Sequence, residues 1–407
     1  MTRQVTIERL GHQGDGVASG PVFVPRTLPG EIVEGEVQGE RMVLPKIVTP
    51  SADRVGAPCR HFKGCGGCSL QHASDAFVLD WKVSLVATAL AARDLPAPIR
   101  NVHVSPPQSR RRATFSGRRT KSGATVGFHA PASDSIREIP DCILLRPALI
   151  ALLPQLQELV GTVASRKGEW RLSVTETDTG LDVVVTGGRA LDAALLLDLT
   201  QFADRADLGR LTWEDETIVT RRPTVLSFGE IAVAPPPGSF LQATREGEIA
   251  LQGAVRDALG SGASKVVDLF AGCGTFSLPT AGMSDVHAVE GDARMLGALD
   301  KAWRHGAGLR QVTTESRDLF RRPLMPDELA RFDAVIIDPP RAGAEAQTQE
   351  LSTAQVSRIA FVSCNPITFA RDADLLTEAG YSMSWIDVVD QFRWSPHVEL
   401  AALFQLT

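Results

Sequence analysis

The sequence of 407 residues predicts a multi-domain protein that ends in a Rossmann-like α/β domain with a doubly wound, mostly parallel sheet. The main observation is the regular alternation of strand-like and helix-like segments from Phe240 onward. A second observation is a series of short strand-like segments before residue 55, separated by Gly and Pro. Between these regions, strands and helices follow a group of closely spaced cysteines, which predicts an α+β central domain.

The composition limits the classes of protein that fit. With 43% hydrophobic residues the chain can build large cores, but no apolar run reaches the about 18 residues of a membrane helix. The first residues lead directly into a strand-like segment, so we expect no signal peptide and a cytoplasmic protein. In that compartment, closely spaced cysteines act as ligands or catalysts rather than as disulfides.

The net charge of −6 does not exclude RNA as a partner, because a local basic surface is sufficient for such binding. From Arg110 to Lys121 the chain carries six basic residues and no acidic residue. This run is either part of an RNA-binding surface or a solvated pair of strands, and the sequence leaves both interpretations open.

The N-terminal segments are typical of a small closed barrel of the oligonucleotide-binding type. Val5–Leu10 alternates apolar and polar residues, and turns are expected at Gly14–Gly16 and Leu28–Glu31. Further short strands are expected at 22–24, 32–33 and 42–44.

The cysteines that follow the barrel have the spacing of a ligand set. Cys59, Cys65 and Cys68 form a C-x5-C-x2-C run, and Cys142 stands farther along the chain. Four thiolates can hold an iron–sulfur cluster or a structural zinc ion. From the residues alone, both remain open.

A helix should follow the cysteine run, from a cap at Ser74 to Ala92, with Phe77, Trp81 and Leu85 on one face. In the central region, strands are expected at 172–174 and 181–185, with a helix at 147–160. The proline-rich segment 235–238 predicts the boundary with the last domain.

In the last domain, a helix over 244–259 precedes a series of strands joined by helices. The strands are expected at 266–269, 286–290, 332–338, 359–363, 384–389 and 398–404. The short connection from Asp390 to His397 predicts that the last strand runs antiparallel to the one before it.

The loop Asp268–Phe276 joins a strand to a helix, and Glu290 ends the next strand. In doubly wound folds such a loop cradles a nucleotide, and the acidic residue accepts hydrogen bonds from the ribose. A nicotinamide cofactor would need a third glycine where Ser277 stands, whereas S-adenosylmethionine has no phosphate to cradle. We therefore expect S-adenosylmethionine, with Cys273 only lining the turn.

Cys364 follows the strand 359–363 and therefore lies at the same edge of the sheet as Asp338. Some amino-methyltransferases have an aromatic residue in the fourth place of the Asp338–Arg341 motif, and Arg341 is not aromatic. Asn365 and Pro366 suit the start of a helix, whose partial positive charge should stabilise a Cys364 thiolate. The alternative is that Cys364 is a small buried hydrophobic residue.

Glu399 begins the reversed last strand, so we expect its carboxylate near Cys364, half-buried and able to accept a proton. A thiolate that adds to carbon 6 of uracil turns the ring into an enolate, and carbon 5 can then attack a methyl group. A base must afterwards remove the proton from carbon 5. Cys364 and Glu399 fit these two roles, and cytosine would follow the same logic.

Taken together, these motifs resemble the RNA 5-methyluridine methyltransferases. The similarity is to one branch of that family, whose members have an N-terminal TRAM domain and a [4Fe-4S] cluster. Members of this branch modify 23S ribosomal RNA. It covers nearly the whole chain and includes Gly14–Gly16, Leu28–Glu31, the four cysteines, Ser239–Gln242, Asp268–Phe276, Asp338–Arg341, Ser363–Pro366 and His397–Glu399.

The resemblance implies a set of site residues. Cys364 would be the nucleophile and Glu399 the base. The pocket for S-adenosylmethionine would be lined by Gln242, Phe270, Thr275, Glu290, Asp318 and Asp338, with Gln242 and Asp338 nearest to the target uracil. The cluster would be held by Cys59, Cys65, Cys68 and Cys142. Two departures from the family pattern are Thr275, often Asn, and the segment 393–395.

The resemblance also implies three domains. They are a TRAM-like barrel at 1–55, a cluster-binding domain at 56–70 and 103–238, and a methyltransferase domain at 71–102 and 239–407.

The expected reaction is methylation of carbon 5 of a uridine in 23S rRNA, with no membrane and no obligatory protein partner. Uracil is preferred to cytosine because the RNA cytosine enzymes carry a further cysteine where Asp338–Pro340 has none. Transfer RNA is an alternative substrate. A different class of function is a non-catalytic RNA-binding or redox-sensing protein that carries the cluster.

Overall fold

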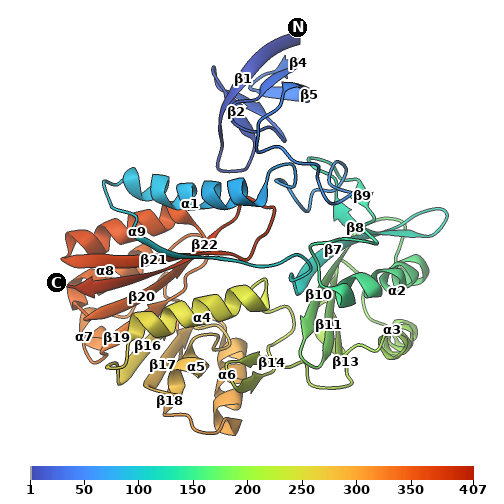
Figure 1. Cartoon of the computed structure of the whole chain (residues 1–407). Helices are drawn as coiled ribbons and strands as arrows, with labels where there is room; N and C mark the ends of the chain where they lie inside the picture. The colour runs from blue at the N-terminus through green and yellow to red at the C-terminus, as the bar shows by residue number, and fades with distance from the viewer. Residues whose placement is uncertain (1) are drawn as a thin grey trace.

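The computed structural model describes residues 2–407 and begins with the expected barrel, which stands apart from the body of the molecule (Figure 1). Its five strands close in the order β1-β2-β3-β5-β4 around Ile7, Val24, Val33 and Met42. Their bounds are β1 Thr2–Leu10, β2 Gly16–Ala18, β3 Val22–Val24, β4 Ile32–Gln38 and β5 Arg41–Thr49. The sequence analysis missed β2, since three residues are too few to give an alternation.

The central region forms a seven-stranded sheet in the order β13-β12-β11-β10-β7-β8-β9. The helices α2 Pro147–Val163 and α3 Ala193–Arg205 pack against it. The strands are β7 Arg112–Arg119, β8 Ala124–His129, β9 Ile136–Arg137, β10 Trp170–Thr177, β11 Gly180–Thr186, β12 Arg210–Trp213 and β13 Glu216–Thr220. A hairpin, β14 Leu226–Phe228 with β15 Ile231–Val233, follows before the last domain.

The last sheet has eight strands in the order β18-β17-β16-β19-β20-β22-β21-β6. Neighbours from β18 to β20 are parallel, and β22 lies antiparallel between β20 and β21, as the short last connection predicts. The bounds are β16 Lys265–Leu269, β17 Asp285–Glu290, β18 Val312–Ser316, β19 Ala334–Ile337, β20 Arg358–Ser363, β21 Tyr381–Asp390 and β22 Glu399–Leu406.

Two strands of this sheet were not predicted. β18 is an edge strand whose residues are mostly exposed, so its sequence carries little apolar pattern. β6, Ile99–Val104, comes from before the central sheet and pairs with β21 at the opposite edge. Such long-range pairing leaves no local signal in the sequence.

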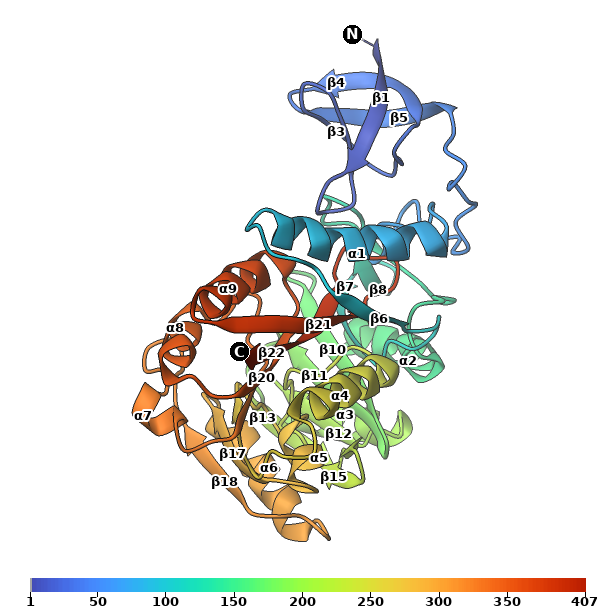
Figure 2. The same cartoon turned by 60° about the vertical axis from the view of Figure 1, so that its left-hand side comes forward.

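Helices cover both faces of this sheet (Figures 1 and 2). α4 Arg245–Leu259 packs on β20 and β22, whereas α1 Asp75–Ala91 packs on α9 Pro366–Glu378. The others are α5 Ser277–Ala281, α6 Ala293–His305, α7 Pro326–Leu329 and α8 Glu345–Ala354. Over residues 2–407, none of the helices has the length and apolar character needed to cross a membrane.

The helix predicted after the cysteine run is α1, and Ser74 caps it by accepting a hydrogen bond from the backbone of Phe77 at 3.2 Å. Its Lys82 side chain is fully buried and pairs with Asp390 at 2.6 Å, at the end of β21. Lys82 also donates to the carbonyl of Phe392 at 3.0 Å. This buried pair therefore connects α1 with the loop that leads into β22.

Replacing Lys82 by Met should destabilise the protein by about 3–5 kcal/mol, because the Asp390 carboxylate would stay buried without its partner. The matched control is Arg93→Met, which removes the exposed pair with Asp374 just after α1 and should cost less than about 1 kcal/mol. Urea unfolding curves measure both changes. Equal losses for the two variants would contradict the importance of the buried pair.

Candidate active site

The eight residues predicted for catalysis and methyl-donor binding lie around one cavity of about 530 Å³. The cavity lies at the carboxyl ends of β16, β17, β19 and β20, where doubly wound sheets bind ligands. These residues are Gln242, Phe270, Thr275, Glu290, Asp318, Asp338, Cys364 and Glu399.

The loop between β16 and α5 turns sharply at one end of the cavity. Phe270, Gly272 and Gly274 all have positive φ angles, of 62°, 57° and 97°. The buried Asp268 carboxylate accepts a hydrogen bond from the hydroxyl of Ser277 at 2.5 Å, so Ser277 fastens the loop to the strand. Burial raises the pKa of Asp268 to about 7.

Glu290 holds two loops together beside the cavity. One carboxylate oxygen accepts from the backbone of Gly272 at 3.0 Å and the other from the backbone of Asp292 at 2.9 Å. Each carboxylate oxygen has more than one lone pair, so each can still accept a hydrogen bond from a ribose hydroxyl group.

Another part of the cavity wall is made of two aromatic rings with an acidic group beside them. The rings of Phe270 and Phe320 lie 5.4 Å apart, and Asp318 accepts from the backbone of Phe320 at 3.1 Å. Aromatic rings and a carboxylate of this kind are groups that can bind the face and the amino edge of a purine. The sequence analysis missed Phe320, since a half-exposed aromatic residue in a loop carries no pattern.

At the reacting end, Asp338 follows β19, Cys364 follows β20 and Glu399 begins β22. Ser363 pairs with Leu400 in the β20–β22 ladder, so the next residue on each strand, Cys364 and Glu399, lies at the same end of the pair. The expected nearness of the two is confirmed.

Glu399 is only 2% exposed, so the expectation of a half-buried carboxylate is wrong. Burial raises the pKa of Glu399 to about 7. Burial and the nearby Glu399 hold the pKa of Asp338 well above its usual value. Glu399 can therefore gain and lose a proton near neutral pH, and Asp338 holds its proton more strongly than a free carboxyl group does.

The prediction that the helix start stabilises a Cys364 thiolate is wrong for the resting protein. The cap is present, because Asn365 accepts from the backbone of Ile367 at 3.1 Å and α9 begins at Pro366. However, burial first, and then the charges of Glu399 and Asp338, raise the pKa of Cys364 to about 12. These effects outweigh the favourable charge of Arg341, so the resting group is a thiol.

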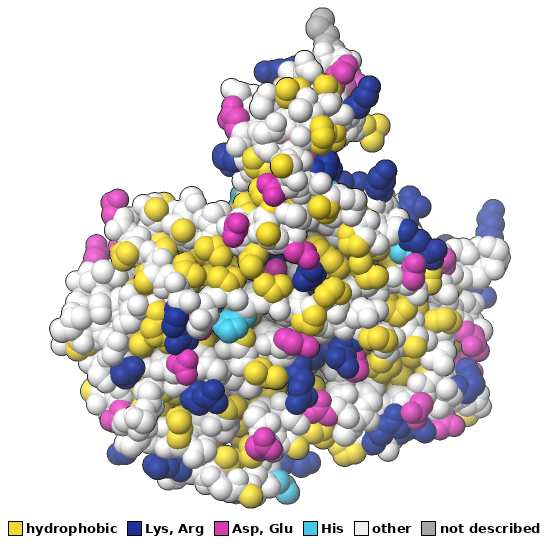
Figure 3. Space-filling view, in the orientation of Figure 1, with side chains coloured by type: hydrophobic (Ala, Val, Ile, Leu, Met, Phe, Trp, Pro, Cys, Tyr) yellow, Lys and Arg dark blue, Asp and Glu magenta, His cyan; other side chains and the backbone are white. Residues whose placement is uncertain are grey.

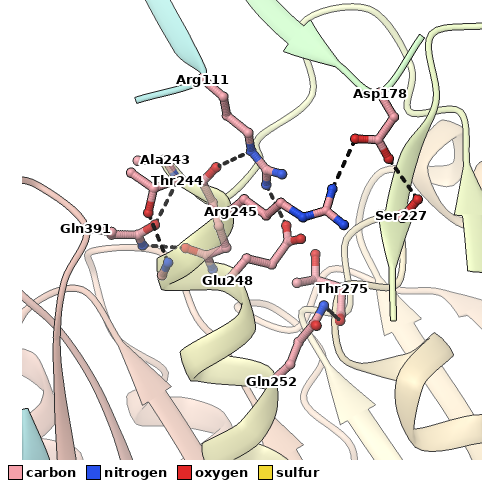
Figure 4. A network of polar contacts seen from close by, with 12 residues as sticks. Arg111, Asp178, Ser227, Ala243, Thr244, Arg245, Glu248, Gln252, Thr275 and Gln391 are labelled. Atoms are coloured by element: carbon pink, nitrogen blue, oxygen red, sulfur yellow. Dashed lines mark hydrogen bonds and ion pairs between the residues drawn. The ribbon is translucent and has the colours of Figure 1, made fainter. Parts of the chain in front are cut away.

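Gln242 and Glu399 are joined by Gln391, a residue that the sequence analysis did not identify. Figure 4 shows Gln391 beside Ala243. Gln391 donates from its side-chain nitrogen to Gln242 at 2.5 Å and to Glu399 at 2.7 Å. It lies in the loop after β21, where no periodicity marks it.

The basic run is not a solvated strand pair throughout. Arg111 is buried, pairs with Glu248 of α4 at 2.5 Å and donates to the carbonyl of Gln242 at 3.1 Å (Figure 4). Arg111 therefore connects the central sheet to the cavity wall, whereas Arg118 and Arg119 remain partly exposed on β7.

The four predicted ligand cysteines line one small cavity that also includes Phe128, Ile139 and Leu144. Burial raises the pKa of the thiols of Cys65, Cys68 and Cys142, that of Cys68 to about 12. Among residues 2–407, no group of three or more His, Cys, Asp or Glu side chains is arranged to hold a metal ion.

A groove of about 920 Å³ runs from Cys364 toward the barrel. Its walls come from every part of the molecule, including His12 of the barrel, Gly66 of the cysteine run, Arg110, Phe392 and Ile367. Lys and Arg side chains gather where the barrel meets the central domain (Figure 3). A second groove there is lined by Arg26, Arg41, Arg54, Lys63 and Arg137. These features suit a polyanion.

Comparisons with known proteins agree with this geometry. A family model described as tRNA (Uracil-5-)-methyltransferase matches residues 306–406. An uncharacterized RNA methyltransferase from Brucella suis is 43% identical over 405 residues, which cover 99% of this chain and 97% of the relative. The 23S rRNA (uracil(1939)-C(5))-methyltransferase RlmD of Shewanella woodyi is 32% identical, over 98% and 95% of the two chains.

Among solved structures, the tRNA (uracil-54, C5)-methyltransferase of Pyrococcus abyssi, in complex with S-adenosyl-L-homocysteine, matches with a TM-score of 0.76. It is 22% identical and covers 98% of this chain and 99% of its own. At that identity the match establishes the fold, including a barrel and a methyltransferase-like α/β domain.

Replacing Glu399 by Gln should speed the alkylation of Cys364 by iodoacetamide at pH 8. A neutral amide removes a negative charge that raises the pKa of the thiol, so more thiolate is present. Peptide mass spectrometry measures the rate at Cys364. The control is Glu315→Gln, at the edge strand β18. If that variant sped the alkylation of Cys364 as much as Glu399→Gln does, the effect of the Glu399 charge on the Cys364 thiol would be contradicted.

Proposed function

We propose that this chain methylates a uridine of 23S rRNA. The premise is that it belongs to the S-adenosylmethionine-dependent RNA (uracil-C5)-methyltransferases. The observation that carries the reaction is the β20–β22 register, which brings Cys364 and Glu399 to one end of the methyl-donor cavity. The full-length similarity to a 23S rRNA enzyme supports the substrate.

Transfer RNA is the second candidate substrate. The names of the matching family model and of the similar solved structure both refer to tRNA. We prefer rRNA because the relative with that name shares 32% of its sequence, against 22% for the tRNA enzyme of known structure.

The proposed chemistry begins with the target base flipped out of the RNA into the crevice, as enzymes acting on bases require. The Cys364 thiol gives its proton to solvent in the groove that it also lines, and the resulting thiolate forms a bond from its sulfur to carbon 6 of uracil. The electron pair of the ring double bond moves to the carbonyl at carbon 4 and gives an enolate. Gln242 and Asp338, at the same end of the cavity, would hold the polar edge of the ring.

When bound, S-adenosylmethionine supplies an electrophilic methyl group, which carbon 5 takes up. Glu399 then removes the proton from carbon 5, the bond between sulfur and carbon 6 breaks, and the ring double bond forms again. A base with a pKa of about 7 suits this step at neutral pH. A large share of Glu399 is then ionised and ready to accept a proton, and it binds that proton more strongly than an ordinary carboxylate would.

Phe270, Thr275, Glu290 and Asp318 would bind the donor. The fit rests on the Glu290 carboxylate for the ribose and on the aromatic pair of Phe270 and Phe320 for the adenine. The intact donor cavity, with Cys364 and Glu399 at its end, argues against a non-catalytic RNA-binding or redox-sensing protein.

We also propose that Cys59, Cys65, Cys68 and Cys142 hold a [4Fe-4S] cluster. All four thiols line one cavity, which supports a shared ligand. Four cysteine thiolates are the ligand set that a [4Fe-4S] cluster takes, so these residues would suffice to hold it. The role would be structural, since the backbone of Ser69 and Leu70, beside Cys68, donates to the carbonyl of Trp394 at 2.8 and 3.0 Å.

The proposal includes a cytoplasmic location and three domains with the limits given above. Sheet membership supports these limits, because β1–β5 close the barrel and α1 packs with the last sheet's helices. RNA is the partner that the proposed activity requires.

A strain that lacks this gene should lose 5-methyluridine from 23S rRNA and keep it in tRNA. Nucleoside mass spectrometry of the two purified RNA fractions measures both levels. A plasmid copy of the gene should restore the rRNA modification, whereas a Cys364→Ala copy should not, because no sulfur is left to activate the ring. Loss from tRNA alone would refute the substrate, and restoration by Cys364→Ala would refute the covalent step.

Protein purified without oxygen should show a broad absorption shoulder near about 400 nm, typical of an iron–sulfur cluster. Replacing Cys142 by Ser should weaken the shoulder and lower the iron content, because one ligand is lost. Cys273→Ser, in the methyl-donor loop, is the control and should keep the iron. Colourless protein that contains one zinc ion per chain would instead support the zinc alternative.

A further inference from the structure

We propose that Gln391 is a positioning residue, which sets the direction of the Gln242 side-chain amide and selects the Glu399 oxygen that takes the proton. This inference rests on the proposed function, because it assigns roles toward the target base. Gln391 itself would not touch the substrate, since it does not line the cavity.

The orientation of the Gln391 amide is determined by its backbone partner. The side-chain oxygen accepts from the backbone N–H of Ala243 at 2.8 Å, and that N–H can only donate. The side-chain nitrogen must therefore face the other way. There it lies 2.5 Å from the Gln242 side-chain oxygen and 2.7 Å from Oε2 of Glu399.

This nitrogen has two hydrogens, one for each partner, and Gln391 is only 2% exposed. The oxygen and the nitrogen of its side chain are thus both hydrogen-bonded within the protein. Gly247 makes the close packing possible. A Cβ atom at that position would stand 2.7 Å from the Cβ of Gln391, a distance that would force one of them to move.

The first consequence concerns Gln242. Its side-chain oxygen is occupied by Gln391, while its side-chain nitrogen has no hydrogen-bond partner among residues 2–407. Because Gln242 lines the cavity, it presents a donor there. The carbonyl at carbon 4 of uracil accepts such a hydrogen bond, whereas the amino group of cytosine at the same place would oppose it. Gln391 therefore favours uracil through Gln242.

The second consequence concerns Glu399. Gln391 occupies Oε2, and Oε1 has no hydrogen-bond partner in the described chain, so Oε1 is free to take the proton from carbon 5. The hydrogen bond from Gln391 also lowers the pKa of Glu399 against the larger effect of burial, which raises it.

The other charged or titratable groups near Glu399 come from three neighbouring strand ends. They are Asp338 and Arg341 after β19, Cys364 after β20, and Asp390 at the end of β21, which is paired with Lys82. Arg341 opposes the rise in the pKa of Glu399, whereas the charge of Glu399 raises the pKa of Asp338. None of them donates to Oε2, so Gln391 has no substitute.

The test uses Gln391→Met, which keeps the length of the side chain and removes both hydrogen bonds to the site. The acid limb of the kcat profile should move to higher pH, because the ionised form of Glu399 loses its donor. RNAs carrying uridine or cytidine at the modified position give the second measurement. The dissociation constant of the cytidine RNA divided by that of the uridine RNA should fall by about tenfold or more. The reason is that the Gln242 amide can then rotate and no longer presents only a donor to the base.

Gly247→Ala is the second variant, because it displaces Gln391 without replacing it and should produce the same two changes. The control is Gln347→Met. Gln347 is also buried and is bonded to the backbone of Leu324 at 2.9 and 3.1 Å, so its loss should lower stability without moving the pH limb or the ratio.

The inference would be overturned if folded Gln391→Met or Gly247→Ala kept both wild-type properties. These are the pH of the acid limb of the kcat profile and the ratio of the dissociation constants for cytidine and uridine RNA. Equal shifts in Gln347→Met would also overturn it, since they would reflect lost stability alone. Failure of the unaltered protein to methylate uridine would refute the proposed function instead. Calorimetric titration with S-adenosylhomocysteine should give the wild-type affinity for all three variants.

Discussion

The site depends on one constraint of topology, the insertion of β22 antiparallel between β20 and β21. In an all-parallel sheet each strand brings its carboxyl end to the ligand edge, so a residue at a strand start would lie at the far side. The reversed strand instead brings its first residue, Glu399, to the edge where Cys364 ends β20. Ladder hydrogen bonds on both sides hold β22 in register, and the pair of side chains is fixed with it.

Burial then determines the chemistry that these side chains can perform. Asp338, Glu399 and Cys364 line the same cavity, and burial raises the pKa of each. The charge of Glu399 adds to the rise for Asp338 and Cys364, and the charge of Asp338 adds to the rise for Cys364. A resting thiol is less open to oxidation or alkylation than a thiolate.

The loop between β21 and β22 is held from several parts of the chain. Lys82 of α1 pairs with Asp390 at its start, and Arg393 pairs with Asp75 at 2.5 Å. The backbone of Ser69 and Leu70 reaches the carbonyl of Trp394 from the cysteine run. Because Glu399 follows this loop directly, the cysteine region, α1 and the last sheet all contribute to the position of the base.

The sequence by itself determined the barrel and the doubly wound domain, and it marked the cysteine set, because these follow from local spacing or a motif. The residues around the donor cavity were implied as a set only by the resemblance to a family. Only the tertiary structure decided that β6 joins the last sheet, that Cys364 rests as a thiol and that Arg111 is buried. It also brought Gln391 between Gln242 and Glu399. The physical reason is that pairing, desolvation and hydrogen bonding depend on neighbours that are distant in the chain, and no local pattern records them.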